Sequence, residues 1–213
     1  MEETFERPGI RGTLHLPDSP NGDAMVLTHG AGSNSDAPLL VQLARAFTDA
    51  GYLVLRFDLT FRQYRSQGPP LPAYAARDRE GILLAAAAVR ELVPGRIFAG
   101  GHSYGGRQTA MAASGHPEMA AALLLLSYPL HPPRRPEQMR TAFFPTLRTP
   151  ALFVHGDRDP FASLEELRRA MALIPAPTDL LAVPGGGHDL IRAGSLAPDL
   201  LARLHDLVCY PGN

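Results

Sequence analysis

The chain has 213 residues and a mass of 22.9 kDa, and 45% of its residues are apolar, which fits one α/β domain with an ample core. A formal net charge of −1 excludes the strongly basic surface that nucleic acids and acidic membranes select. The single cysteine, Cys209, excludes an internal disulfide and fits a reducing cytosol. With no signal-like start and no apolar run of membrane length, we expect a soluble, cytoplasmic protein that binds neither nucleic acid nor membrane.

Strand-like apolar runs alternate with helix-forming stretches along the whole chain. The expected strands cover residues 9–16, 24–28, 53–57, 96–100, 121–127, 151–155 and 179–183. The expected helices cover residues 36–50, 74–92, a stretch from 105, 163–174 and 197–208. The run at 121–127 has helical propensity, but its length and its place in the alternation favour a buried strand. The pattern predicts an α/β fold, a mostly parallel central sheet with helices on both faces, as a single domain over 1–213.

Residues 101–105 read Gly-His-Ser-Tyr-Gly, between the strand at 96–100 and the helix that follows. Gly-x-Ser-x-Gly in this setting is typical of a nucleophile elbow, in which a strained turn lifts the serine hydroxyl above the sheet edge. The flanking glycines let the chain pass close by. In a random Gly-rich turn Ser103 would be only a turn former. The context favours Ser103 as a catalytic nucleophile.

Two loops downstream carry partners for such a serine in the order acid, then histidine. Asp157 and Asp159 follow the strand at 151–155, and His188 lies in a Gly-rich loop after the strand at 179–183. We predict Asp159 as the acid, because the loop must extend beyond the strand end to reach a histidine; Asp157 remains the alternative. His188 would be the general base and then the acid, with Asp159 holding its tautomer.

An acyl-transfer site also needs donors for the oxyanion. The first is the N–H of Tyr104, and the second should come from residues 28–34, where His-Gly-Ala-Gly follows a strand. Ala31 is the favoured donor and Gly32 the next. A phosphate-binding glycine loop is the competing interpretation, but neither of its usual glycine patterns is present.

These motifs together resemble those of the α/β-hydrolases. The resemblance rests on His-Gly-Ala-Gly near residue 30, Gly-His-Ser-Tyr-Gly-Gly near 103, His-Gly-Asp-Arg-Asp-Pro-Phe near 157 and Gly-Gly-Gly-His at 188. It is strongest to a compact branch similar to dienelactone hydrolases, and it implies an α/β-hydrolase fold with a Ser-His-Asp triad. Dienelactone hydrolase itself uses a cysteine nucleophile where this chain has Ser103, which disfavours dienelactone as the substrate. Some relatives of the branch are subunits of larger complexes, so a non-catalytic interaction module is the alternative.

Two loops should shape the substrate pocket. Residues 58–72 follow a strand end and carry Arg62 and Arg65, either of which offers a fork for a substrate carboxylate, although the sequence favours a solvated surface role for both. Residues 128–148 begin at Tyr128 and stand where many hydrolases insert a cap, but are too short for a full lid. We therefore expect a minimal or absent cap domain and an open pocket, with Gly32, Arg62 and Tyr128 as candidate substrate contacts.

Eight histidines raise the question of a metal, but no His-x-x-x-His or Cys-x-x-Cys spacing is present. The sequence therefore predicts no metal and no cofactor. The function it favours is a serine hydrolase of a small or medium ester or thioester, through an acyl-enzyme. Substrate identity and oligomeric state cannot be read from the residues.

Overall fold

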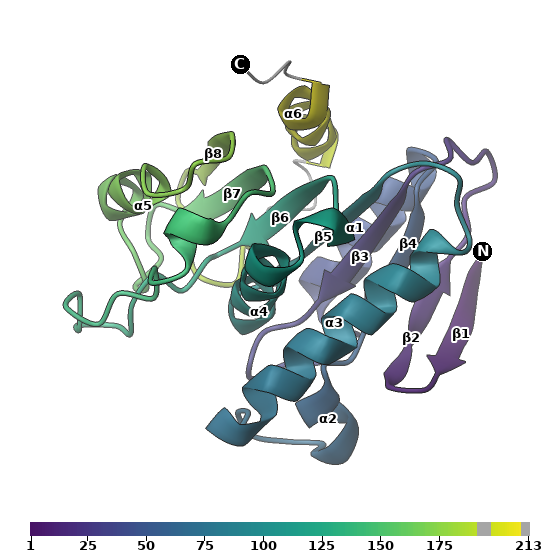
Figure 1. Cartoon of the computed structure of the whole chain (residues 1–213), viewed down its shortest axis with the longest axis horizontal. Helices are drawn as coiled ribbons and strands as arrows, with labels where there is room; N and C mark the ends of the chain where they lie inside the picture. Colours follow the sequence, from purple (N-terminus) through teal and green to yellow (C-terminus); the bar gives the residue numbers. More distant parts are fainter. Residues whose placement is uncertain (191–196, 210–213) are drawn as a thin grey trace.

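A computed structural model of the chain describes residues 1–190 and 197–209. Eight strands form one sheet in the order β1-β2-β4-β3-β5-β6-β7-β8 (Figure 1). Strand β2 pairs antiparallel with β1 on one side and with β4 on the other, and every other neighbouring pair is parallel. The strands are β1 (Glu2–Arg7), β2 (Ile10–His15), β3 (Ala24–Thr28), β4 (Leu53–Phe57), β5 (Ile97–His102), β6 (Ala122–Leu126), β7 (Ala151–Gly156) and β8 (Thr178–Val183).

Helices cover both faces of this sheet. Figure 1 shows α3 and α4 in front of the strands and α1 behind them, and the two buried clusters divide in the same way, with α5 on the α3 face and α6 on the α1 face. The α-helices are α1 (Pro38–Asp49), α2 (Thr60–Tyr64), α3 (Ala75–Arg90), α4 (Tyr104–Gly115), α5 (Leu164–Met171) and α6 (Ala197–Cys209). Short 3₁₀ turns are η1 (Pro72–Tyr74), η2 (Pro117–Met119) and η3 (Phe144–Thr146).

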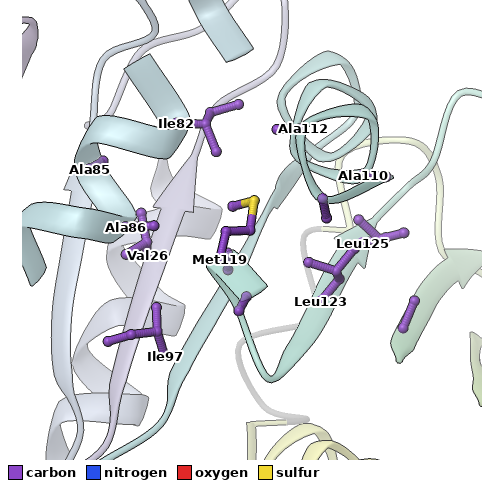
Figure 2. Packing of buried hydrophobic residues seen from close by; sticks show 14 of the residues in the cluster. Val26, Ile82, Ala85, Ala86, Ile97, Ala110, Ala112, Met119, Leu123 and Leu125 are labelled. Carbon is purple, nitrogen blue, oxygen red and sulfur yellow. The ribbon is translucent and has the colours of Figure 1, made fainter. Parts of the chain in front are cut away.

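The central strands are buried along their whole length because helices cover both sides of them. The ambiguous Leu-rich run forms β6, as expected, and every residue of it is buried. In Figure 2, Leu123 and Leu125 of this strand face Ala110 of α4, while Val26 of β3 lies beside Ala86 of α3. Leu124 and Leu126 belong to the other buried cluster, with residues of α1 and α6. Alternate residues of the strand therefore pack on opposite helix layers, and this fixes the register of the sheet.

All of the expected strands and helices are present, with ends shifted by a few residues. Two elements were not expected. Strand β1 has one buried residue, Phe5, among charged and polar neighbours, so its sequence has no apolar alternation. Helix α2 has only five residues inside the loop that was expected at 58–72, too few for a helical period to show.

No additional domain covers the loops at the carboxyl edge of the described sheet. Between β6 and β7 the described chain forms only η3, so no cap domain covers this edge, as expected. The loops after β3, β5, β7 and β8 meet there, which is where parallel sheets bind ligands. Within the described residues, no helix has the length and apolar character needed to cross a membrane.

A buried pair of ionisable side chains, His15 of β2 and Arg56 of β4, gives a prediction for the pH dependence of stability. His15 Nε2 accepts a hydrogen bond from Arg56 Nε at 2.8 Å, so the ring must be neutral at that nitrogen. Burial lowers the pKa of His15 to about 4. Between about pH 6.5 and 4 the unfolded chain therefore takes up a proton that the folded chain does not, and the free energy of unfolding should fall by about 3 kcal/mol as the pH falls through this range.

Urea unfolding at several pH values would check this, with His15→Gln as the variant. Glutamine retains an acceptor for Arg56 but does not titrate, so the slope between pH 6.5 and 4 should become shallower. His116→Gln, at an exposed position, is the control and should leave the slope unchanged. An unaltered slope in His15→Gln would contradict the assignment.

Candidate active site

Ser103 lies on a strained turn between β5 and α4. Its φ of 51° and ψ of −115° place a non-glycine residue in a left-handed conformation that is costly and typical of functional sites. The turn is possible because the chain approaches closely on both sides. A Cβ on Gly101 would lie 2.6 Å from the carbonyl oxygen of Thr28, and one on Gly105 would lie 2.4 Å from that of His29. The geometry contains the expected elbow, and these close contacts explain why both positions are glycines.

The three predicted triad residues meet at the carboxyl edge of the sheet. The Ser103 hydroxyl donates to His188 Nε2 at 2.8 Å. The opposite nitrogen, Nδ1–H, donates to Asp159 Oδ2 at 2.8 Å. These two bonds fix the tautomer that lets the imidazole take a proton from the serine.

Asp159 is held as a carboxylate at the buried end of this relay. Burial alone would raise the pKa of Asp159, but hydrogen bonds from His188 and from the N–H of Phe161 outweigh it and keep the pKa below its ordinary value. The His155 ring lies 3.8 Å from the same carboxylate oxygen. An ionised Asp159 can stabilise the imidazolium that forms when His188 accepts a proton.

The alternative acid, Asp157, faces a different partner. Its Oδ1 accepts a hydrogen bond from the N–H of Gly185 at 2.8 Å. That bond ties the loop after β7 to the loop after β8, which carries His188. Asp157 therefore supports the position of the histidine loop and makes no bond to the ring.

Two further residues position His188 and had been given no such role from the sequence. The Phe161 ring stacks on the His188 ring with centroids 4.3 Å apart. On the other side, His102 Nε2 donates to the carbonyl oxygen of His188 at 2.6 Å. Phe161 ends the His-Gly-Asp-Arg-Asp-Pro-Phe motif that contains the acid, so its position in the motif is a signal that could have identified it. No sequence signal indicates that His102 bonds the carbonyl oxygen of His188.

The two predicted oxyanion donors line one shared cavity of about 490 Å³. Tyr104 is the first residue of α4, so its N–H has no acceptor within the helix, and in the described parts of the chain no hydrogen bond uses the N–H of Ala31. His29 anchors the Ala31 loop from below. Its Nδ1–H donates to the carbonyl oxygen of Gly30 at 2.8 Å, and its Nε2 accepts from the N–H of Leu59 at 3.1 Å.

The substrate contacts expected at Arg62 and Tyr128 require correction. Arg62 is buried, and its guanidinium donates to four carbonyl oxygens of the surrounding loops, so it holds these loops together and does not lie solvated on the surface. Tyr128 is fully buried, and its hydroxyl donates to the carbonyl oxygen of Arg140. Gly32 is exposed and lines a separate hollow beside Arg62. Sequence alone could not reveal these placements, because arginine and tyrosine are as compatible with loop support as with ligand binding.

Comparisons with known proteins agree with this geometry. A family model described as an alpha/beta hydrolase domain matches residues 21–205. A dienelactone hydrolase from Anabaena variabilis is similar in structure, with a TM-score of 0.74, 19% identity and 96% of each chain covered. An α/β serine hydrolase without a lid from Xanthomonas campestris matches with a TM-score of 0.68 and 18% identity, over 100% of this chain and 96% of the other.

Est1E from Butyrivibrio proteoclasticus also matches, with a TM-score of 0.70 and 18% identity, over 96% of this chain and 98% of the other. At these identities the similar structures establish the fold. The family model covers most of the chain, including the elbow, the acid loop and the histidine loop. The chain therefore belongs to the α/β-hydrolase domain family.

Proposed function

We propose that this protein is a serine hydrolase that cleaves small or medium carboxylic esters or thioesters. The observation that carries the proposal is the continuous relay from Ser103 through His188 to Asp159, with 2.8 Å at each hydrogen bond. Heavy-atom distances of this length allow proton transfer without rearrangement. The strained backbone of Ser103 supports the same proposal, because residues in costly backbone conformations are concentrated at active sites.

In the proposed mechanism the Ser103 oxygen attacks the substrate carbonyl while its proton passes to His188 Nε2. The amides of Ala31 and Tyr104 hold the negative oxygen of the tetrahedral intermediate. His188 then returns the proton to the leaving alkoxide or thiolate, which departs as alcohol or thiol and leaves an acyl-serine. Water attacks this ester, gives its proton to His188, and releases the carboxylic acid as Ser103 is reprotonated. The route uses only side chains, backbone amides and water.

Labelling with a fluorophosphonate probe tests the proposal. The serine oxygen displaces fluoride from phosphorus only when a base activates it, so the chain should be labelled within minutes and Ser103→Ala should remain unlabelled. A surface serine, Ser163→Ala, is the matched control and should label like the unchanged chain, because Ser163 caps α5 and lies outside the relay.

The absence of labelling in a chain whose circular dichroism shows it to be folded would overturn the proposal. That result would instead favour the non-catalytic interaction module. Labelling that persists in Ser103→Ala would equally contradict the assignment of the nucleophile.

A further inference from the structure

The cavity beside the oxyanion donors has a wall that the proposed mechanism does not use. Besides Ala31 and Tyr104 it is lined by the Pro69–Pro72 segment and by three arginines from separate elements. Arg79 comes from α3, Arg107 from α4, and Arg140 from the loop between β6 and β7. Arg107 lies one helical turn from the nucleophile, since its N–H donates to the carbonyl oxygen of Ser103 at 3.0 Å.

These three guanidinium groups have no carboxylate partner among the described residues. Arg79 donates to the amide oxygen of Gln108 at 3.0 Å, and Arg140 donates to the carbonyl oxygen of Pro129 at 3.2 Å. The Nε atom of Arg107 is buried, and within the described residues it has no hydrogen-bond partner. Some arginines elsewhere form ion pairs, namely Arg7, Arg11, Arg45, Arg56, Arg96, Arg169 and Arg203. Others, such as Arg134 and Arg168, form none within the described part of the chain but are exposed to water, whereas the three cavity arginines are half-buried.

The charges are also close enough to disfavour one another. Burial lowers the pKa of Arg140, and the nearby charge of Arg107 lowers it further. Burial raises the pKa of Tyr128, and these same two guanidinium groups oppose that rise, which puts both beside the one hydroxyl. One carboxylate, Asp78, lies under this wall, but it is fully buried and is occupied by the Tyr104 hydroxyl and a backbone N–H.

Half-buried like charges are costly when the one nearby carboxylate is hydrogen-bonded to other groups, and an anion that enters the cavity relieves that cost. Arginine is suited to the task because its planar fork matches a carboxylate with two parallel bonds. The prolines, Leu71 and Met111 supply apolar surface in the same cavity. The cavity thus fits a chain that is apolar in its middle and anionic at its end.

We propose that the substrate is a half-ester or half-thioester of a dicarboxylic acid, whose free carboxylate is bound by Arg107 and Arg140, with Arg79 adding positive charge. This rests on the proposed hydrolase function, in which the ester carbonyl lies at Ala31 and Tyr104. The backbones of Ser103 and Arg107 are one helical turn apart, a rise of about 6 Å. We take adipate, whose carboxyl groups are joined by about four methylene groups of similar total length, as the first acid to test.

The first experiment compares two 4-nitrophenyl esters of similar length, the charged hydrogen adipate and the neutral hexanoate. Rates with Ser103→Ala are subtracted to remove spontaneous hydrolysis. We expect kcat/KM to be at least about 10-fold higher for the adipate at low salt, and this preference should shrink as salt screens the charges. A ratio near one would overturn the proposal.

Variants then test the residues. Arg107→Met and Arg140→Met should each lower the adipate-to-hexanoate ratio by about 10-fold, toward one, because a charge-assisted hydrogen bond is lost while the side-chain stem remains. Arg107→Lys should restore part of the ratio, since it keeps the charge without the fork. Arg168→Met, on the exposed face of α5, is the control and should not change it. Unchanged ratios in both methionine variants would refute the assignment.

Two further arms separate the alternatives. Calorimetry with monoethyl adipate and folded Ser103→Ala measures binding without catalysis. If the ligand binds and the added change Arg107→Met abolishes binding, the anion site is supported even if no ester is hydrolysed. If the ligand does not bind, the anion site is refuted. A 4-nitrophenyl ester of 5-phosphonopentanoate tests the other common oxyanion. If it is hydrolysed faster than the adipate, the bound group is a phosphate type and the carboxylate assignment is wrong.

Discussion

His188→Gln should lower kcat for 4-nitrophenyl acetate by about 10⁴- to 10⁶-fold, one of the two largest effects we expect. The ring nitrogen that accepts the Ser103 proton at 2.8 Å would be replaced by an amide that cannot act as a base at neutral pH. Initial rates at pH 7.5 measure the loss. His116→Gln, an exposed histidine, is the matched control and should stay within about twofold of the unchanged chain.

The double variant sharpens this prediction. Serine and histidine act as one unit, so Ser103→Ala combined with His188→Gln should be no slower than either single change. Losses that multiply would mean that the two residues act independently, and the relay would then have no role in catalysis. More than about a tenth of the original kcat remaining in His188→Gln would contradict it as well.

The second large effect separates two acids that lie two residues apart. Asp159→Asn should lower kcat by about 10⁴-fold, because an amide can favour the tautomer that carries its proton on Nε2, which then cannot accept from Ser103. Asp157→Asn should cost less than about 10-fold, since its Oδ1 bonds the N–H of Gly185 and an amide oxygen can accept the same bond. The same ester assay serves both variants, and equal losses or the reverse order would show that the acid was wrongly chosen.

Most of the fold could be predicted because parallel strands have a strong local pattern. Buried runs such as the one that forms β6 are apolar on both faces, and they alternate with helices of regular period. Strand β1 could not be found this way. It lies at the outer edge with only Phe5 buried, and its pairing with β2 depends on a neighbour and not on its own composition.

The candidate site could be predicted where chain order and spacing carry the chemistry. The elbow around Ser103 and the loops that carry Asp159 and His188 each follow a strand end, and the fold brings such ends together. The supporting side chains could not be predicted, because their roles depend on which loops lie beside them. Arg62 fills a loop, whereas Arg107 and Arg140 face the cavity, and nothing in their local sequence distinguishes the three.

The strand order means that the nucleophile follows a central strand of the sheet and the base follows an edge strand. Ser103 follows β5, which has a paired neighbour on each side. His188 follows β8, which is the outermost strand of the described sheet, pairs there with β7 alone and is half-exposed along most of its length. Fluctuations that release an edge strand need far less energy than those that open the centre of a sheet. Thermal inactivation should therefore begin with the departure of the imidazole, while the serine and its turn are still intact.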